Sequence, residues 1–271
     1  TGARAIRPVA ELADKKRIAA SFSRHSSTYD TYAAEQLAGS AELVAYAAHY
    51  AADIAPGPVL EIGCGTGFLS AELAAIFPDR DLEFTDLSSA MLAHCRERIA
   101  AAGRARPTQR YRVLDGDRLD VEGRYALVAA NFVVHWFADL SGGLGRMARA
   151  LQPGGLLLCA YPGVDSYREW REQCLRQGVP CSANLLPDRA TVAAALAGVA
   201  IEQGQREVRL RFACAREFFG YLQRTGAGIS TRGVTPRPGQ LRRLIRGWDE
   251  HCPDGVDITC HVHYLAARKE G

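Results

Sequence analysis

The most constraining feature of this sequence is a short apolar run followed at once by three closely spaced glycines. Residues 59–62 (Val-Leu-Glu-Ile) have the character of a buried strand, and Gly63, Gly65 and Gly67 precede a stretch of helical composition that starts at Phe68. Glycines at a strand-to-helix junction let a ligand approach the backbone and the positive end of the helix. A dinucleotide-binding loop would have its third glycine at position 68, so the spacing argues against a pyrophosphate site.

The alternation of strand and helix continues along the chain and predicts an α/β fold. Apolar runs predict seven strands, at residues 59–62, 82–85, 111–114, 125–130, 156–161, 201–212 and 258–267. Helical stretches separate most of them, which is typical of a doubly wound, mostly parallel sheet. We expect one domain over residues 1–271. Its parts are N-terminal helices (1–55), a Rossmann-like core (56–212 and 254–271) and a helical lid inserted before the last strand (213–253).

Polar residues stand where three of the predicted strands end. Asp86 follows the second strand, Asp117 the third and Asn131 the fourth. The carboxyl ends of parallel strands meet at one edge of a sheet, where open α/β folds bind ligands. Asp86, about 20 residues beyond the glycines, can accept hydrogen bonds from both hydroxyls of a ribose. The alternative is that Asp86 caps the helix beginning near Ser88. Met91, one turn into that helix, would face the ring of a bound nucleoside.

Composition restricts the remaining possibilities. The chain is 48% hydrophobic with a net charge of +3, which does not favour nucleic acid as a partner. No apolar run approaches the roughly 20 residues that cross a bilayer, so we expect no membrane association. The eight cysteines are scattered without a C-x-x-C pair, and we therefore expect no metal site. Because the start of the sequence lacks a secretory signal, we expect a cytoplasmic protein, and we expect a monomer.

Charge is unevenly distributed along the chain. From Gly204 to the end there are 12 basic and 7 acidic residues, a local excess of positive charge. Such an excess can attract an acidic partner, although a solvated arginine-rich surface is an equally simple explanation.

Residues 61–67 resemble motif I of class I S-adenosylmethionine methyltransferases, E/D-x-G-x-G-x-G. The resemblance implies that S-adenosyl-L-methionine is the cofactor and S-adenosyl-L-homocysteine its product. It implies that Glu61 helps to order the loop and the methionine ammonium, and that Asp117 accepts the adenine amino group, with Asp115 as the alternative. The cofactor-binding residues expected on this basis are Glu61, Gly63, Cys64, Gly65, Gly67, Asp86, Leu87, Met91, Asp117, Arg118 and Asn131.

A second resemblance, extending over almost the whole chain, is to the malonyl-acyl-carrier-protein O-methyltransferase family of biotin synthesis. It is carried by residues 18–30, 131–140, 151–155 and 222–239. The sequence departs from the family pattern at His135, where we expect Gln. It departs again at residues 225–228 (Thr-Gly-Ala-Gly), where we expect Gly-Ile-Gly-Ala or a similar run. Both departures concern the methyl acceptor rather than the fold.

The family resemblance implies that the acceptor is the free carboxylate of a malonyl group on an acyl carrier protein. A carboxyl group with a pKa of about 4 is ionised at pH 7, so its methylation depends on positioning and needs no general base. We expect Tyr29 to orient the carboxylate and the methyl group. We expect Arg232, in the lid, to bind the malonyl carboxylate, with Arg224, Arg237 and Arg24 as alternatives.

Other functions remain as alternatives. His135 is expected to be a packing residue beside Trp136, because no general base is required for a carboxylate. The main rival function is a small-molecule O-, N- or C-methyltransferase of secondary metabolism or quinone synthesis, which would share the first five strands. A nucleotide-binding oxidoreductase and a binding protein without turnover are the two other rivals.

Overall fold

The computed structural model of the chain describes residues 7–225 and 228–270. Its centre is one sheet of seven strands in the order β3-β2-β1-β4-β5-β7-β6. β7 is antiparallel to both of its neighbours, and the other pairs are parallel. The strands are β1 (Val59–Ile62), β2 (Leu82–Asp86), β3 (Gln109–Val113), β4 (Tyr125–Asn131), β5 (Leu151–Pro162), β6 (Val199–Phe212) and β7 (Val256–Lys269). The predicted doubly wound, mostly parallel sheet is confirmed.

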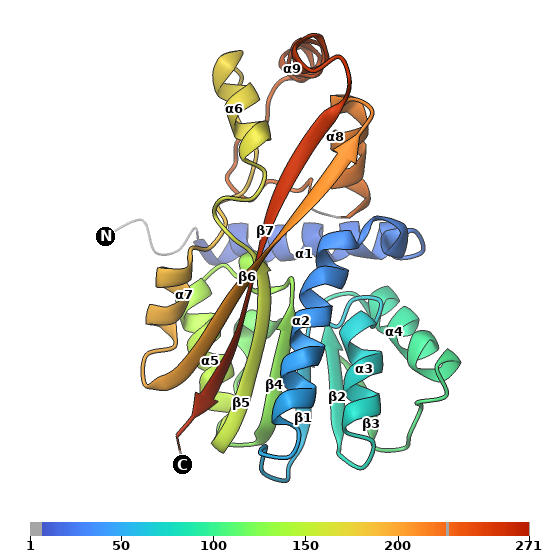
Figure 1. The fold of residues 1–271 in the computed structure, drawn as a ribbon, viewed down its shortest axis with the longest axis vertical. Helices are drawn as coiled ribbons and strands as arrows, with labels where there is room; N and C mark the ends of the chain where they lie inside the picture. Colours follow the sequence, from blue (N-terminus) through green and yellow to red (C-terminus); the bar gives the residue numbers. More distant parts are fainter. Residues whose placement is uncertain (1–6, 226–227, 271) are drawn as a thin grey trace.

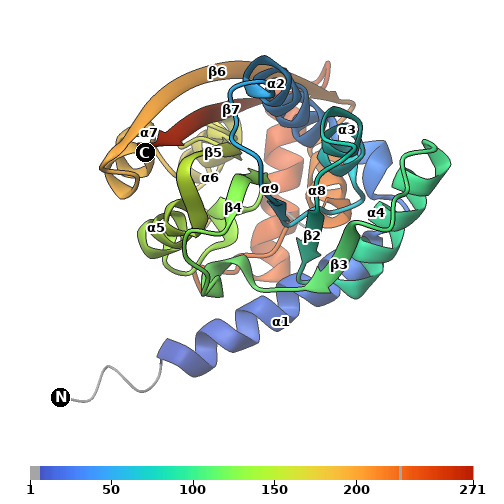
Figure 2. The same ribbon diagram turned by 90° about the horizontal axis from the view of Figure 1, so that it is seen from below.

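Helices cover both faces of this sheet (Figures 1 and 2). On one face, α2 (Ala34–Tyr50), α3 (Phe68–Ile76) and α4 (Ser89–Ala101) bury apolar side chains against the strands. On the other face, α5 (Leu140–Ala150) and α7 (Arg189–Ala195) do the same. The central strand β4 is buried at every position except its last residue, because helices cover it on both sides.

A third layer lies beyond the carboxyl ends of the parallel strands. It consists of α6 (Arg168–Arg176), α8 (Ala215–Arg224) and α9 (Pro238–His251), which we call the lid layer. Trp170, Phe218 and Trp248 form the centre of its apolar cluster, and Val256 and Ile258 at the start of β7 join it. Part of this cluster, on α6, lies outside residues 213–253, the segment expected to form the lid. Residues 226–227, which carry part of the family resemblance, lie outside the described residues.

The N-terminal helix α1 (Arg7–His25) crosses the molecule between the core and the lid layer (Figure 1). A short 3₁₀ turn, η1 (Tyr29–Tyr32), joins α1 to α2. Two further 3₁₀ turns follow strands β3 and β4, namely η2 (Gly116–Arg118) and η3 (Val134–Trp136). Segments before the sheet and segments after its strands therefore meet at the carboxyl edge of the parallel strands.

The fifth strand is longer than the sequence predicts. The apolar run predicts residues 156–161 only. Instead α5 ends at Ala150 and β5 starts at once, with Leu151 already paired to Tyr125. A register shift between Tyr125 and Leu127 accommodates the residues around Pro153, which cannot donate to a ladder. Among the described residues, no helix has both the length and the apolar character needed to cross a bilayer.

Candidate functional site

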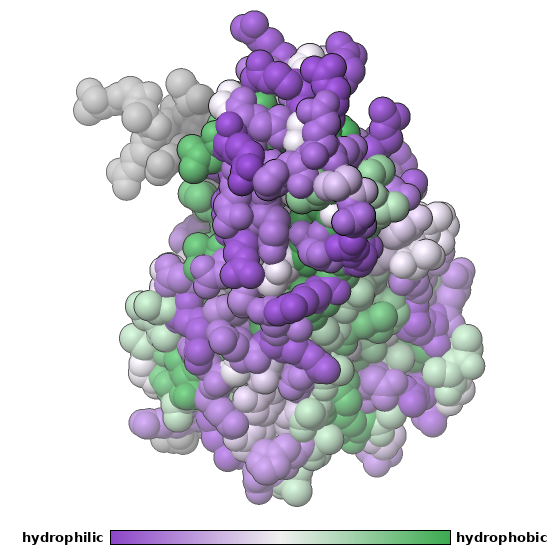
Figure 3. Space-filling view, turned by 45° about the horizontal axis from the view of Figure 1, so that its top comes forward, coloured by the Kyte–Doolittle hydropathy of each residue, from purple (hydrophilic) through white to green (hydrophobic). Residues whose placement is uncertain are grey.

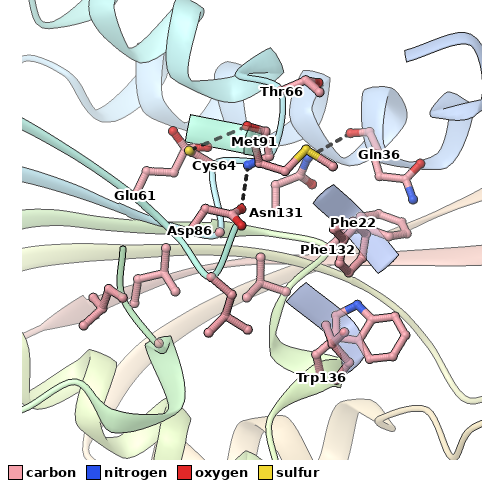
Figure 4. Close-up of a pocket in the computed structure, with 18 of the residues that line it drawn as sticks. Phe22, Gln36, Glu61, Cys64, Thr66, Asp86, Met91, Asn131, Phe132 and Trp136 are labelled. Carbon is pink, nitrogen blue, oxygen red and sulfur yellow. Dashed lines mark hydrogen bonds between the residues drawn. The ribbon is translucent and has the colours of Figure 1, made fainter. Parts of the chain in front are cut away.

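A cavity lies at the carboxyl ends of β1, β2 and β4 (Figure 4), and its empty space, with the open solvent at its mouth included, is about 820 Å³. We call it the strand-end cavity. Lys15, Ile18 and Phe22 of α1 close it from above. Most of the residues predicted to bind the cofactor line it, namely Glu61, Gly63, Cys64, Gly65, Asp86, Leu87, Met91 and Asn131. Residues from three strands, four α-helices and the glycine loop therefore converge on one space.

The glycine loop can adopt its course only because the glycines lack side chains. Gly63, Gly65 and Gly67 all have positive φ, at 66°, 54° and 93°. A Cβ on Gly63 would lie 2.2 Å from a methyl carbon of Val133. A Cβ on Gly65 would meet nothing within 4 Å, and Gly65 is the glycine that faces open space. Of the three, Gly67 is not among the lining residues; it is the N-cap of α3 and packs against Cys95.

Asp86 stands at the end of β2 with its carboxylate turned toward the loop. One oxygen accepts a hydrogen bond from the Gly65 amide at 3.0 Å, and the other accepts one from the Ser88 amide at 2.8 Å. The cap of α4 is Ser88, whose hydroxyl accepts from the Met91 amide at 3.2 Å. Each carboxylate oxygen retains a free lone pair, which a ribose hydroxyl can use. Burial raises the pKa of Asp86 to about 6.

Glu61 lies at the inner end of the same cavity. Its side chain is buried and accepts a hydrogen bond from the Ser70 hydroxyl at 2.6 Å. Burial raises the pKa of Glu61 to about 8, and the neighbouring Asp86 carboxylate adds to the shift. The half-buried Asp86 and the buried Glu61 both line this end of the cavity, and a cation bound near them would favour their ionised forms.

Two buried acceptor atoms beside the cavity have no partner among the described residues. Asn131 donates its amide to the Gln36 carbonyl oxygen at 2.9 Å, but its own side-chain oxygen accepts nothing (Figure 4). The side-chain oxygen of Gln36 is likewise buried and unpaired. Buried polar atoms normally have partners, so these two indicate that a ligand with N–H donors belongs here. An amino-acid ammonium would supply such donors, and the glycine bend at Gly63 and Gly65 lines the same cavity.

The motif resemblance implies that Asp117 binds the adenine, but its carboxylate has other partners. Its carboxylate accepts from the Ala138 amide at 2.7 Å and pairs with Arg146 at 3.2 Å and Lys15 at 3.4 Å. It does not line the strand-end cavity, whereas Asp115, the alternative, does. Asp115 also pairs with Lys15, at 3.0 Å.

Arg118 completes the set of residues expected to bind the cofactor. It lies in a separate surface hollow that Arg146 and Arg149 also line, away from the strand-end cavity.

A second cavity lies between the first one and the lid layer, and we call it the lid cavity. Five residues line both cavities and therefore stand between them, namely Phe22, Tyr29, Gln36, Phe132 and Trp136; we call this shared wall the passage. Four of these five, all but Tyr29, are labelled in Figure 4, and they lie together on the side opposite Glu61 and Asp86. The sequence analysis predicts a role for Tyr29 in orienting the acceptor, whereas nothing in the sequence around Gln36 predicts a role for that residue.

Tyr29 contributes a phenolic hydroxyl group to the passage. It is buried, and burial together with the nearby carboxylates of Asp86 and Glu35 raises its pKa well above the usual value. Its hydroxyl therefore keeps its proton at neutral pH and can act as a hydrogen-bond donor.

Neutral side chains dominate the lid cavity. His135 lines it, contacts the rings of Phe132 and Trp136, and has a pKa lowered to about 3 by burial. Of the described residues that line this cavity, none is Lys or Arg. Arg232 lies just outside, where its guanidinium donates to the carbonyl oxygen of Ala183, which is itself a lining residue.

Comparison with known proteins agrees with this geometry. A family model described as a methyltransferase domain matches residues 60–157. Among solved structures, the YcgJ protein of Bacillus subtilis has a TM-score of 0.60 at 12% identity, over 85% of this chain and 99% of that one. A methyltransferase of Bacillus halodurans, described as putative in its title, has a TM-score of 0.60 at 16% identity, over 84% and 99%. Together with the curated relatives described next, the matched domain defines the class: the chain is an S-adenosylmethionine-dependent methyltransferase.

Curated relatives define the family. The malonyl-[acyl-carrier protein] O-methyltransferase of Magnetococcus marinus is 31% identical over 208 residues, 76% of this chain and 76% of that protein. Malonyl-[acyl-carrier protein] O-methyltransferase 2 of Ilyobacter polytropus is 25% identical over 274 residues, 95% of this chain and 99% of that protein. The chain belongs to the malonyl-[acyl-carrier protein] O-methyltransferase family.

Proposed function

We propose that the enzyme methylates the free carboxylate of a malonyl group carried by acyl carrier protein, a step of biotin synthesis. The observation that carries the proposal is the pair of cavities joined through a shared wall. One cavity suits a cationic nucleoside, and the other opens toward the lid layer. The names of the relatives supply the acceptor.

In this proposal the strand-end cavity holds S-adenosylmethionine. The Asp86 carboxylate binds the ribose, Leu87 and Met91 flank the adenine, and Asp115 rather than Asp117 is the acid placed to reach the adenine edge. When bound, the cofactor supplies an electrophilic methyl group on a sulfonium.

The amino-acid end of the cofactor would lie against the glycine loop. Gly63, Cys64 and Gly65 offer backbone there, and the unpaired oxygens of Asn131 and Gln36 accept hydrogen bonds from the ammonium. Gly67 and Arg118 then act indirectly, by shaping the loops on which the lining residues stand.

The passage residues would orient the acceptor. A malonyl carboxylate is ionised at neutral pH, so no proton must be removed before transfer. The Tyr29 hydroxyl, which keeps its proton, can donate to one carboxylate oxygen and leave the other free to react. Gln36 borders the same passage, and the aromatic walls formed by Phe22 and Trp136 exclude water from it.

Arg232 is the residue we propose for binding the malonyl carboxylate, and Arg224, Arg237 and Arg24 are its alternatives. Its support is its position at the rim of the lid cavity, through Ala183. Replacing Arg232 with Met should raise KM for a malonyl thioester about tenfold or more, since it removes a charge-assisted hydrogen bond. If Arg232→Met and Arg224→Met raise KM by the same factor, the cause would instead be a general effect of positive charge.

An acidic carrier protein would dock on the basic lid layer. The upper part of the molecule in Figure 3 is mostly hydrophilic, and the chain from Gly204 onward is rich in arginine. If docking depends on charge, kcat/KM with carrier-bound substrate should fall as salt rises, whereas kcat/KM with a simple thioester should not. If kcat/KM for both substrates is equally insensitive to salt, docking by charge is contradicted. We also propose a cytoplasmic location and a monomeric enzyme.

The deciding experiment is a product analysis. The protein is incubated with isotope-labelled S-adenosylmethionine and a panel of malonyl thioesters, free acids and phenols, and the products are identified by mass spectrometry. We expect a methyl ester of the malonyl thioester. One observation favours a second candidate, a small-molecule methyltransferase: the lid cavity has no cationic side chain among its described lining residues, which suits a neutral acceptor. Methylated phenols with untouched thioesters would establish that function instead.

A further inference from the structure

A buried carboxylate with two tyrosine partners lies behind the wall of the lid cavity. Glu35, in the first turn of α2, is 1% exposed. The Tyr167 hydroxyl donates to one of its oxygens at 3.0 Å, and the Tyr221 hydroxyl donates to the other. The three residues come from α2, from the junction between β5 and α6, and from α8. This network therefore ties the core to two parts of the lid layer.

The arrangement carries costs that simple packing would avoid. A buried carboxylate loses hydration, and burial raises the pKa of Glu35 while the two tyrosine hydroxyls act in the opposite direction. Tyr167 has a positive φ of 60°, an uncommon conformation for a residue with a side chain. Its backbone amide donates to the Thr259 carbonyl oxygen at 2.7 Å, which fixes it to β7. An apolar trio could fill the same space without burying a charge, so the network points to a role in function.

The network is directly continuous with the lid cavity. Tyr167 lines that cavity itself, and Leu222, next to Tyr221, lines it from α8. Thr225, which also lines it, donates to the Tyr221 carbonyl oxygen at 3.1 Å. On the core side, Gln36, next to Glu35, belongs to the passage between the two cavities. Neither Glu35 nor Tyr221 lines the strand-end cavity.

We propose that Glu35 is a positioning residue that fixes α8 and the start of α6 relative to Gln36, and thereby sets the shape of the acceptor site. Glu35 does not touch the acceptor in this arrangement. It acts through Tyr167 and through Tyr221, which places Leu222 and Thr225. This proposal rests on the proposed function only in taking the lid cavity as the place where the acceptor binds.

The first experiment separates acceptor binding from cofactor binding. The variant Tyr221→Phe removes one hydroxyl and leaves the ring in place. We expect KM for the acceptor to rise about tenfold, because one hydrogen bond to a buried charge is lost, while kcat changes little. The Kd for S-adenosylhomocysteine should stay within about twofold of wild type, since neither Glu35 nor Tyr221 lines the strand-end cavity. Glu35→Gln keeps one acceptor oxygen, and its effect should be similar or smaller.

The chain offers a matched control. The Tyr50 hydroxyl donates to Glu202 at 2.7 Å, at the far end of the same helix α2 and on an exposed surface. Tyr50→Phe removes the same kind of hydrogen bond without touching either cavity. It should leave KM, kcat and Kd unchanged. If Tyr221→Phe behaves like Tyr50→Phe, or raises KM and the Kd for S-adenosylhomocysteine in parallel, the proposal is wrong.

A second measurement keeps the test independent of the acceptor. Hydrogen exchange in the whole protein should be faster over residues 215–225 in Tyr221→Phe than in wild type, and the double variant Glu35→Gln/Tyr221→Phe should add little to either single change. If malonyl thioesters are not methylated by wild type, the proposed function fails, and the KM comparison uses whichever acceptor the product panel identifies. Faster exchange over 215–225 combined with an unchanged KM for that acceptor would overturn the assignment of Glu35.

Discussion

The two cavities differ in how the chain builds them. The strand-end cavity is formed largely by residues that directly follow β1, β2 and β4, so short segments of sequence carry most of its geometry. The lid cavity is formed by one to three residues from each of many segments, among them α1, η1, α2, η3, α6 with the loops around it, and α8. The first cavity is therefore fixed by local structure at a sheet edge, and the second exists only when distant segments are packed together.

The two cavities also differ in the charges of the residues that line them. The strand-end cavity is lined by the half-buried Asp86 and the buried Glu61, whose pKa values are raised to about 6 and about 8 by loss of hydration. The lid cavity contains aromatic rings and a neutral His135. In our proposal the first region binds the cationic cofactor, and the second admits an acyl chain whose carboxylate is bound at the rim. Changes in the first region should therefore act on cofactor affinity, and changes in the second on the acceptor.

The largest effect is expected for Asp86→Ala. Its carboxylate holds the Gly65 and Ser88 amides and, in our proposal, both ribose hydroxyls. Losing two hydrogen bonds to a charged group should raise the Kd for S-adenosylhomocysteine by about 100-fold or more, measured by calorimetry. Asp81→Ala, at the exposed residue just before the start of the same strand, is the control and should change nothing. A similar Kd for both variants would remove Asp86 from the ribose site.

A somewhat smaller effect is expected for Gly63→Ala. The new Cβ would collide with Val133, 2.2 Å away, in a backbone conformation that disfavours side chains. We expect the Kd for S-adenosylhomocysteine to rise about tenfold, because the loop and Val133 must shift. Gly123→Ala has a comparable φ of 61° but open space around it. It should cost only about 1 kcal/mol of unfolding free energy, with cofactor affinity unchanged. Equal affinity in both variants would mean that the loop tolerates the displacement.

A change of pH should also act selectively on the cofactor cavity. The pKa of Asp86 is about 6, and only the ionised form accepts both ribose hydroxyls. The Kd for S-adenosylhomocysteine should thus be constant just above pH 7 and rise, toward about tenfold per pH unit, below pH 6. Glu61, with a pKa of about 8, stays protonated in this range and does not contribute. Asp86→Asn should bind weakly at every pH between 5 and 7, and a persistent slope in that variant would assign the titration to another group.

The same contrast explains what could be predicted from the sequence. The seven strands and the cofactor loop follow from apolar runs and glycine spacing, because both are local properties of the chain. Asp117 was less predictable, since the turn η2 directs its carboxylate to Ala138 and Arg146 while leaving Asp115 at the cavity. Which of two acids within three residues faces a ligand depends on partners about 20 or more positions away.

The acceptor side could be predicted far less. Gln36 and Glu35 are adjacent in one helix, and no periodicity distinguishes them, yet one borders both cavities and the other binds two tyrosines from the lid side. Those tyrosines are 132 and 186 positions away in the chain. Pairing over such separations is decided by tertiary packing, so a reading of local patterns cannot find it.

The smallest effect is expected for His135→Gln, which tests whether the lid cavity lacks acid–base chemistry. Burial lowers the pKa of His135 to about 3, so the ring is neutral and weakly basic at any pH where the enzyme would be assayed. An ionised carboxylate needs no base, and Gln is neutral and polar as well. We expect kcat/KM to stay within about threefold of wild type between pH 6 and 8. A loss of several hundredfold would mean that the acceptor must give up a proton to His135, and the lid cavity would then belong to a small-molecule methyltransferase rather than to one acting on a carboxylate.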